Sequence, residues 1–134
     1  MEKDIRWKQR FQNLDKAFTF LAGALQIENP SELEQAGIIQ AYEFTFELSW
    51  KTLKDFLEYN KIEAVFPRDV IKESFKNGLI DDGDIWMDML DKRNLIAHTY
   101  NDDNARTAIL LIRNKYFLQL EKLYGLLVVK KTYE

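Results

Sequence analysis

The sequence predicts an all-α fold: an antiparallel, up-and-down bundle of four long helices and one short helix. Two observations carry this prediction. Apolar residues recur at alternating spacings of three and four over most of the 134 residues, which is the period of an amphipathic helix. Only 5 glycines and 2 prolines occur, so signals for hairpin turns are scarce. The polar breaks between the apolar stripes are short, as in bundles whose neighbouring helices are antiparallel.

The first expected helix covers residues 4–26 and carries one apolar stripe. The stripe consists of Trp7, Phe11, Leu14, Phe18, Leu21 and Leu25. Pro30 then breaks the chain, because the residue before a proline is disfavoured in the helical conformation. Ser31, with Glu34 three residues later, has the spacing of a capping box, which predicts that a second helix opens there and continues to about Tyr59.

This second helix is apolar on two sides. One side presents Ile39, Tyr42, Phe46, Trp50, Leu53 and Leu57. The other side presents Ile38, Ala41, Phe44 and Leu48. A helix of this kind is either central in its bundle or buried against a partner chain, and the sequence leaves both alternatives open.

A short helix is expected over residues 68–77, after a loop over residues 60–67. Its apolar residues are Val70, Ile71 and Phe75. Gly78 follows and suits the position just past a helix end. The next helix follows Asp81-Asp82-Gly83-Asp84, whose three acidic residues are favourable at a helix N-terminus, and ends near His98. Its expected core residues are Ile85, Trp86, Met89, Leu90 and Ile96.

The last long helix follows an expected turn over residues 101–104, which also supplies its N-cap. Its stripe consists of Ala105, Ile109, Ile112, Tyr116, Leu120, Leu123 and Leu127. The segment after Gly125 either extends this helix or pairs as a strand.

Composition predicts one domain, residues 1–134, in a cytoplasmic protein. Hydrophobic residues make up 46% of the chain and include 3 Trp, 6 Tyr and 9 Phe, which excludes disorder as the main state. The absence of cysteine excludes a disulfide framework and a thiol nucleophile, and the single histidine argues against a metal site, so we expect no metal or cofactor. A net charge of −3 gives no support for a general electrostatic grip on nucleic acid. Neither a signal-peptide pattern nor a membrane-spanning apolar run is present, so we expect no membrane association.

The densest polar cluster lies between Arg93 and Tyr100 and contains the only histidine, His98. Within a regular helix Asn94 and His98 share one face, whereas Arg93 and His98 are about 140° apart around the axis. Both can act on one phosphate only through the reach of the arginine, an unwound last turn, or a second copy of the cluster across a dimer axis. A helix C-terminus favours the charged imidazolium, which predicts a raised pKa for His98.

This set of residues suits cleavage of RNA without a metal ion. His98 would take the proton from a ribose 2′-hydroxyl or give one to the leaving oxygen, and Arg93 would stabilise charge on the phosphoryl oxygens. Because acid and base are both needed and the chain has one histidine, this chemistry calls for a symmetric dimer. A structural alternative stays open: His98 caps the last carbonyls of its helix, and Arg93 forms a salt bridge with an acid of its own helix or of the last one.

Three further clusters each have a functional and a structural interpretation, and the structural one is favoured for each. The acidic set Asp84, Asp88 and Asp91 is a carboxylate metal site or a solvated face, with Asp88 and Lys92 as an ion pair. The aromatic set Tyr42, Phe44, Phe46 and Trp50 is a stacking surface for bases, or core and dimer interface. The basic set Lys51, Lys54, Arg68, Lys72 and Lys76 is a patch for a polyanion or a solvated face.

The segment Arg93-Asn94-Leu95-Ile96-Ala97-His98-Thr99-Tyr100 matches the R-X4-H-X-Y motif of HEPN-domain proteins, and nearly the whole chain resembles that family. Residues 41–54 (AYEFTFELSWKTLK) resemble the second-helix signature of its nucleotidyltransferase substrate-binding branch. Residues 66–69 and 78–80 and Trp86 add to the resemblance. The R-X4-H spacing alone is weakly specific, whereas its combination with the second-helix block and the tyrosine is fairly specific.

The resemblance implies a HEPN-like helical homodimer partnered by a separate, small nucleotidyltransferase. The chain is similar to HepT-type toxins, ribonucleases whose arginine and histidine act on RNA at the dimer cleft and whose partner, the antitoxin, transfers AMP to the motif tyrosine. These roles fall here on Arg93 and His98 as catalytic residues, Asn94 as a supporting polar residue and Tyr100 as the modification site. The older name of the branch implies instead a non-catalytic subunit that binds the substrate of the transferase.

Overall fold

The computed structural model describes residues 2–97 and 102–133 of the chain. Over these ranges the secondary structure is helical, without a strand. The elements are α1 (Lys3–Ala24), α2 (Glu32–Tyr59), α3 (Pro67–Lys76), α4 (Gly83–Ala97), α5 (Asp102–Leu111), the π-helical turn η1 (Ile112–Tyr116) and α6 (Phe117–Tyr133). Because α5, η1 and α6 follow one another without a break, they count as one long helix, and the all-α prediction of four long helices and a short one is confirmed.

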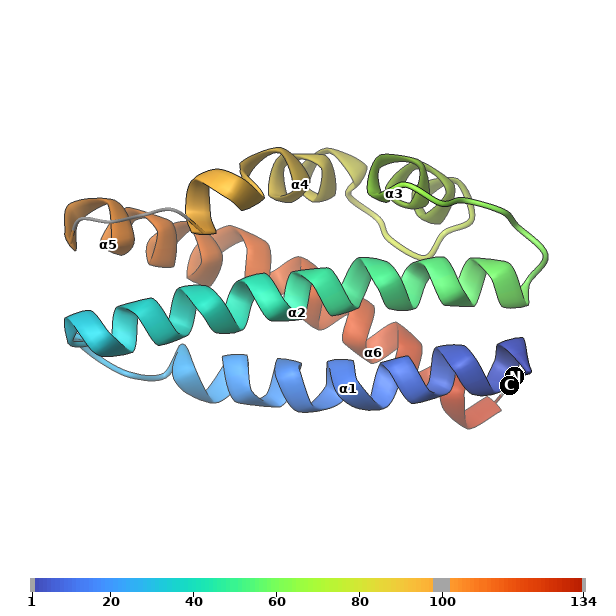
Figure 1. The fold of residues 1–134 in the computed structure, drawn as a ribbon, viewed down its shortest axis with the longest axis horizontal. Helices are drawn as coiled ribbons and strands as arrows, with labels where there is room; N and C mark the ends of the chain where they lie inside the picture. Colours follow the sequence, from blue (N-terminus) through green and yellow to red (C-terminus); the bar gives the residue numbers. More distant parts are fainter. Residues whose placement is uncertain (1, 98–101, 134) are drawn as a thin grey trace.

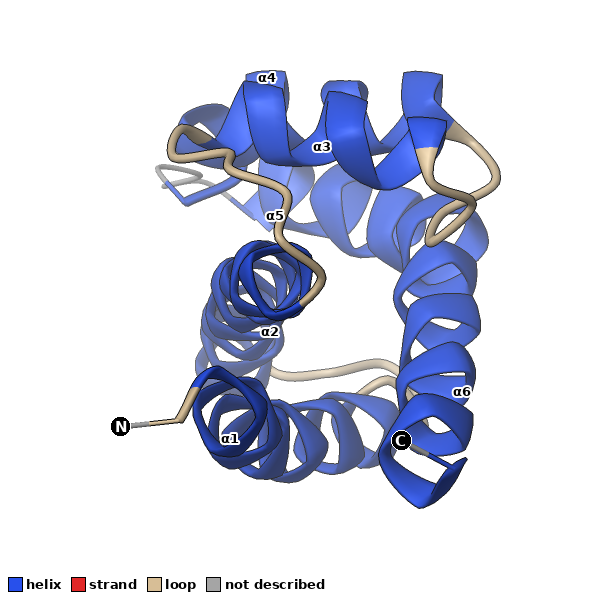
Figure 2. Cartoon of the chain, turned by 90° about the vertical axis from the view of Figure 1, so that its right-hand side faces the viewer, coloured by secondary structure: helices blue, strands red, loops and turns tan. Residues whose placement is uncertain are grey.

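Helix α2 is the central element of the bundle. Helices α1 and α2 are antiparallel and lie side by side along the long axis, with α3 and α4 on the other side of α2 (Figure 1). The segment from α5 to α6 crosses these layers diagonally, and the end view in Figure 2 shows α6 as a separate wall beside α1 and α2. Helix α2 contacts all the other α-helices, which explains why its sequence is apolar on more than one side.

The helix ends follow the predicted local chemistry. The Ser31 hydroxyl accepts from the Glu34 N–H at 3.1 Å, and the Glu34 carboxylate accepts from the Ser31 N–H at 2.9 Å, so the predicted capping box is present. Asp82 accepts from the Ile85 N–H at 3.1 Å at the start of α4. Gly78 has φ +73°, the left-handed conformation that ends α3 and that glycine adopts without steric cost.

The core is one continuous cluster in which aromatic rings join the helices. Trp7 of α1 meets Phe56 of α2 edge to face, with ring centroids 4.9 Å apart. Phe46 of α2 lies against Trp86 of α4 at 6.0 Å, so the interface between α2 and α4 is fixed by large rings. Three buried hydroxyls of α2 each donate a hydrogen bond to the backbone carbonyl four residues earlier, so burial leaves none of the three unpaired. They belong to Thr45, Ser49 and Thr52.

The last helix departs from the prediction in two respects. Residues 102–104, expected in a turn, form the first turn of α5, and Asn101 lies outside the described residues. Within the stripe, residues 112–116 form a π-helical turn whose first and last side chains are buried. The segment after Gly125 extends α6 to Tyr133, which decides the open alternative in favour of a helix.

The described helices also bear on two smaller expectations. Phe75, expected to be an apolar residue of α3, is more than half exposed, whereas its neighbours Val70 and Ile71 are fully buried. None of the helices in the described ranges combines the length and the apolar character that crossing a bilayer requires.

Candidate functional site

The C-terminal turns of α4 position the first residues of the candidate site. Ile96 is buried in the core and anchors this end of the helix, so Asn94 and Leu95 face outward. Arg93 is half-buried at the edge of the contact with α2. His98 and Tyr100 lie outside the described residues, and the predicted pKa of His98 lies with them. The structure therefore brings Arg93 and Asn94 to one exposed helix end.

Arg93 is held by a carboxylate of the central helix. Its Nη1 donates to Oε1 of Glu47 at 3.4 Å, and the two side chains are 37% and 32% exposed. The expected salt bridge exists, but its acid belongs to α2 and not, as predicted, to the helix of Arg93 or to the last helix. The packing of Phe46 on Trp86 brings the neighbouring Glu47 toward α4, which is the physical reason for the difference.

Glu47 is itself oriented by a buried ring. The indole Nε1–H of Trp50 donates to its second carboxylate oxygen, Oε2, at 2.8 Å. Since the three residues form a chain of contacts, the guanidinium of Arg93 is tied to the core of α2 and not to a freely rotating acid. The contact with Glu47 engages Nη1, and a guanidinium has five N–H donors in a planar fork that suits an anion.

A second network fixes the middle of α4. The hydroxyl of Tyr116, at the end of the π-helical turn, donates to Oδ2 of Asp88 at 2.6 Å. This hydrogen bond, assisted by Lys92 and Lys115, lowers the pKa of the Asp88 carboxyl. Burial, followed by the same hydrogen bond, raises the pKa of Tyr116 well above its usual range. Asp88 is thus kept charged and bound, and α4 is tied to the last helix.

The acidic set does not form a metal site in the described residues. Asp88 is occupied by Tyr116 and by the predicted ion pair with Lys92 at 3.2 Å, and Asp91 pairs with Arg68 at 2.6 Å. No group of three potential ligands converges anywhere in the described ranges. The ion pair predicted between Asp88 and Lys92 is present, and the contacts made by Asp88 and Asp91 favour the structural interpretation of this set.

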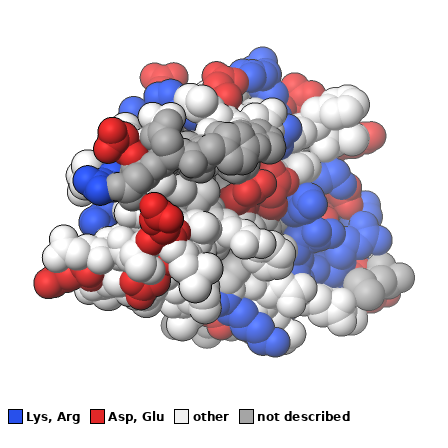
Figure 3. Space-filling model, turned by 60° about the vertical axis from the view of Figure 1, so that its left-hand side comes forward, with Lys and Arg blue, Asp and Glu red and all other residues white. Residues whose placement is uncertain are grey.

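The aromatic and basic sets are mostly structural as well. Tyr42, Phe46 and Trp50 are buried in the core, and only Phe44 of the aromatic set is exposed. In the basic set, ion pairs join Lys54 to Glu58, Arg68 to Asp91 and Lys76 to Glu73, and the ammonium of Lys51 lies over the Trp50 ring. On the face drawn in Figure 3, several basic side chains gather on the right of the view, with acidic side chains beside them.

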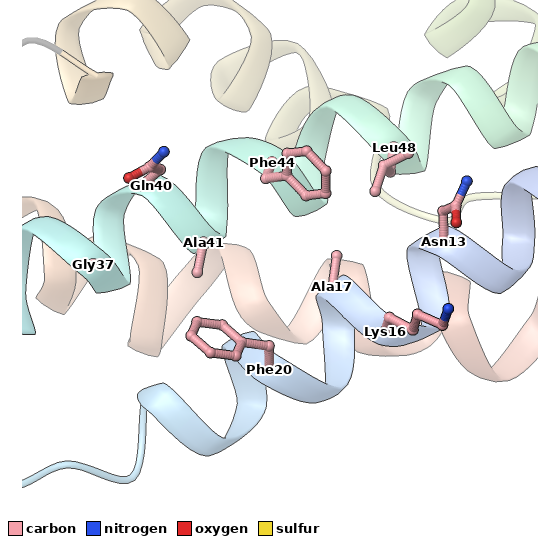
Figure 4. Close-up of a pocket in the computed structure, with 9 residues that line it drawn as sticks. All are labelled: Asn13, Lys16, Ala17, Phe20, Gly37, Gln40, Ala41, Phe44 and Leu48. Carbon is pink, nitrogen blue, oxygen red and sulfur yellow. The ribbon is translucent and has the colours of Figure 1, made fainter.

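An apolar strip runs along the exposed side of α1 and α2. Phe20 of α1 and Phe44 of α2 are 68% and 60% exposed, with Ala17 and Ala41 between them (Figure 4). The strip is lined by Asn13, Lys16, Ala17, Phe20, Gly37, Gln40, Ala41, Phe44 and Leu48. It contains most of the second apolar side that the sequence showed on α2, which is therefore not consumed by the core of the bundle.

Sequence reasoning missed Glu47 and Trp50 as parts of the site. The spacing of three between them is a signal that their side chains can meet on one helix. The link to Arg93 joins residues 46 positions apart, and helical periodicity says nothing about which turn of α2 faces which turn of α4. Only the packed helices disclose that contact.

Fold and site define a helical-bundle protein whose fourth helix presents a half-exposed, carboxylate-paired arginine. Residues 9–128 match the family described as "nucleotidyltransferase substrate binding protein like". The match covers most of the sequence, and the chain belongs to this family.

Solved structures of similar proteins agree with the fold. A protein of Thermus thermophilus is 32% identical, with a TM-score of 0.76 over 85% of this chain and 98% of that one. A Haemophilus influenzae protein, described as having the fold of a substrate-binding domain of a nucleotidyltransferase, is 30% identical, with a TM-score of 0.74 over 88% of this chain and 98% of that one.

A curated relative carries a name with an activity. The probable ribonuclease HepT of Haemophilus influenzae is 37% identical over 75 residues, which are 52% of this chain and 51% of that protein. The matched part of the chain thus spans about half the length of this relative.

Proposed function

We propose that this protein is the HEPN partner of a minimal nucleotidyltransferase and acts as a HepT-type toxin, an endoribonuclease that needs no metal ion. The observation that carries the proposal is the half-exposed Arg93, held near the end of α4 by Glu47 and followed in the sequence by the other motif residues. Membership of the family supports the partner, and the name of the Haemophilus influenzae relative supports the activity. In this proposal residues 1–134 act as one cytoplasmic domain.

The cleavage step is a transesterification. The ribose 2′-oxygen attacks the adjacent phosphorus, the O2′–P bond forms and the P–O5′ bond breaks, which leaves a 2′,3′-cyclic phosphate and a 5′-hydroxyl. His98 takes the proton from the 2′-hydroxyl, and His98 of a second copy gives a proton to the departing 5′-oxygen. Arg93 donates to the non-bridging phosphoryl oxygens as charge develops on them, and Asn94 adds a polar contact.

The two histidines of this step require a homodimer. The apolar strip supports self-association, because an exposed contiguous apolar surface typically marks an interaction site. Phe20 and Phe44 project from the strip, and Ala17 and Ala41 leave a hollow between them, so one copy can fill the hollow of another.

Tyr100 is the proposed site of control by the nucleotidyltransferase. Its phenol oxygen attacks the α-phosphorus of ATP, an O–P bond forms, pyrophosphate leaves, and a base of the transferase takes the phenol proton. The attached AMP places bulk and negative charge in the segment that follows Arg93. It therefore competes with the phosphate of RNA for the guanidinium.

A second candidate function is a non-catalytic subunit that presents substrate to a nucleotidyltransferase. The family description and the description of the Haemophilus influenzae structure favour it. In that function Arg93 contacts a phosphate or carboxylate of the substrate and cleaves nothing.

Expression without and with the nucleotidyltransferase separates the two functions. The toxin arrests growth when expressed alone, and His98→Ala abolishes the arrest while its circular dichroism spectrum stays unchanged. Gln9→Ala, an exposed change on α1, serves as the control and stays toxic. Equal toxicity of the His98→Ala protein would contradict the catalytic role, and a wild-type chain without toxicity would favour the substrate-binding subunit.

A further inference from the structure

Glu47 divides its two carboxylate oxygens between two different groups. Oε2 accepts from the Trp50 indole at 2.8 Å, and Oε1 accepts from Arg93 at 3.4 Å. Trp50 is buried in α2, so the carboxylate has one fixed side and one side that faces the half-exposed guanidinium. Glu47 therefore links the guanidinium of Arg93, at the end of a long and flexible side chain, to a residue that is fixed in the core.

The contact is too weak to serve stability alone. It is a single-nitrogen contact between half-exposed groups, and such pairs contribute little to folding. Its geometry has another consequence, because a carboxylate on one nitrogen restricts rotation of the guanidinium and leaves the remaining donors for a phosphate. Its charge has the opposite effect, because a carboxylate beside the arginine repels an approaching phosphate.

We propose that Glu47 is a positioning residue for Arg93, which trades affinity for the RNA phosphate against the correct placement of the guanidinium in the transition state. The inference rests on the proposed function, in which Arg93 stabilises the phosphoryl group. It assigns a role to a residue of α2, far in the sequence from the motif that carries the chemistry.

Two variants separate the placement of the guanidinium from the effect of the negative charge. In Glu47→Gln the amide oxygen still accepts from Trp50, but the negative charge is lost; we expect kcat to fall on the order of tenfold because the arginine is no longer held. KM and the Kd for an uncleavable 2′-O-methyl RNA oligonucleotide should fall about threefold because the repulsion is gone. In Trp50→Phe the charge stays and the orienting donor is lost, so kcat falls and KM does not.

Glu43→Gln is the matched control. Glu43 lies one turn earlier on the same helix, is exposed, and has no hydrogen bond or ion pair in the described ranges. The control makes the same change in net charge and should leave kcat and KM within about twofold of the wild-type values. Thermal unfolding of all four proteins at equal concentration confirms that each is folded.

Side-chain nitrogen NMR of Arg93 gives a readout that does not depend on catalysis. Rotation about the bond between Nε and Cζ of Arg93 is restricted in the wild type and in Glu43→Gln, and becomes faster in Glu47→Gln. The proposal is overturned if Glu47→Gln behaves like Glu43→Gln in kcat, KM and rotation.

Failure of the proposed function looks different. If neither the wild type nor Arg93→Ala cleaves RNA, the nuclease function is wrong, and binding of the 2′-O-methyl oligonucleotide decides the role of Glu47. Tighter binding by Glu47→Gln than by Glu43→Gln, together with faster rotation of Arg93, supports it. Binding that does not depend on Arg93 overturns it.

Discussion

Helix α2 has two different sides: one packs against α4 and the last helix, and the other carries the exposed apolar strip. We expect substitutions on the first side to affect folding and substitutions on the second side to affect association. Toward α4 and the last helix, α2 is closed: Phe46 lies on Trp86, Tyr42 lies on Tyr116, and the Thr45 hydroxyl donates to the Ala41 carbonyl of the same helix. Toward the exposed strip, it is open: Phe44 is mostly exposed. Between these two sides, at the edge of the contact with α4, Glu47 pairs with the half-exposed Arg93. The closed side stabilises the fold, whereas the open side is where we propose that a second copy binds.

The largest expected effect tests the closed side. Trp86 is fully buried, so Trp86→Ala removes a large ring from the interface of α2 and α4 and should lower the free energy of unfolding by about 4 kcal/mol. Phe44→Ala on the open side should change it by no more than about 0.5 kcal/mol at concentrations where the protein is monomeric. Urea unfolding measures both, and similar losses for the two variants would break the comparison.

The next effect concerns an ion pair between α1 and α2. Arg10 donates from Nε to Asp55 at 2.6 Å, and the Asp55 side chain is only 4% exposed. Arg10→Ala leaves that carboxylate buried without its cation and should cost about 2 kcal/mol of unfolding free energy. Arg6→Ala is the control: it removes a more exposed pair with Glu58 and should cost about 0.5 kcal/mol. Equal costs would show that burial of Asp55 does not matter.

A smaller effect sharpens the description of the open side. Phe44→Ser should weaken self-association by at least about tenfold, because it removes a large ring from the centre of the apolar strip. Sedimentation equilibrium over a range of concentrations measures the dissociation constant. Leu33→Ser changes another strongly exposed apolar residue of α2, outside the strip, and should leave association unchanged. An unaffected Phe44→Ser protein would place the dimer interface elsewhere.

The smallest effect is a pH dependence on the closed side. The folded pKa of Asp88 is lowered, mainly by Tyr116, so its stabilisation is present above the ordinary value of 3.8 and is lost as the pH falls through and below it. Tyr116→Phe should cost about 1 kcal/mol near neutral pH. The difference from the wild type should shrink as the pH falls to about 3. Urea midpoints at both pH values measure it, and a gap that widens in acid would contradict the role of Asp88.

The closed side could be predicted from the sequence because it depends on local chemistry. The apolar period placed Trp7, Trp86 and Ile96 in the core, and the Ser31 and Glu34 pair marked the start of α2. The apolar residues of the last helix keep their spacing of three and four through the π-helical turn, so the sequence pattern did not predict that turn. The open side was visible only as an alternative between a central helix and a partner-bound one.

The candidate site was predicted less completely. The R-X4-H-X-Y resemblance singled out Arg93 and Asn94, which the structure places at one exposed helix end. The partner of Arg93 was expected on the wrong helix, because a salt bridge between α2 and α4 depends on the rotation of two packed helices about their axes. No periodic pattern in one chain encodes that rotation, and the Glu47 contact had to be seen in the packed structure.

The central claim is that Arg93 and His98 cleave RNA, and the most direct measurement is cleavage by the chain purified without a nucleotidyltransferase, in the presence of EDTA. We expect the wild type to give products that end in 2′,3′-cyclic phosphate and 5′-hydroxyl groups. Arg93→Ala and His98→Ala should lower the rate at least about a hundredfold. Intact mass verifies that Tyr100 carries no AMP in the assayed protein. Unmodified, folded wild type that cleaves no faster than Arg93→Ala and His98→Ala would contradict the claim.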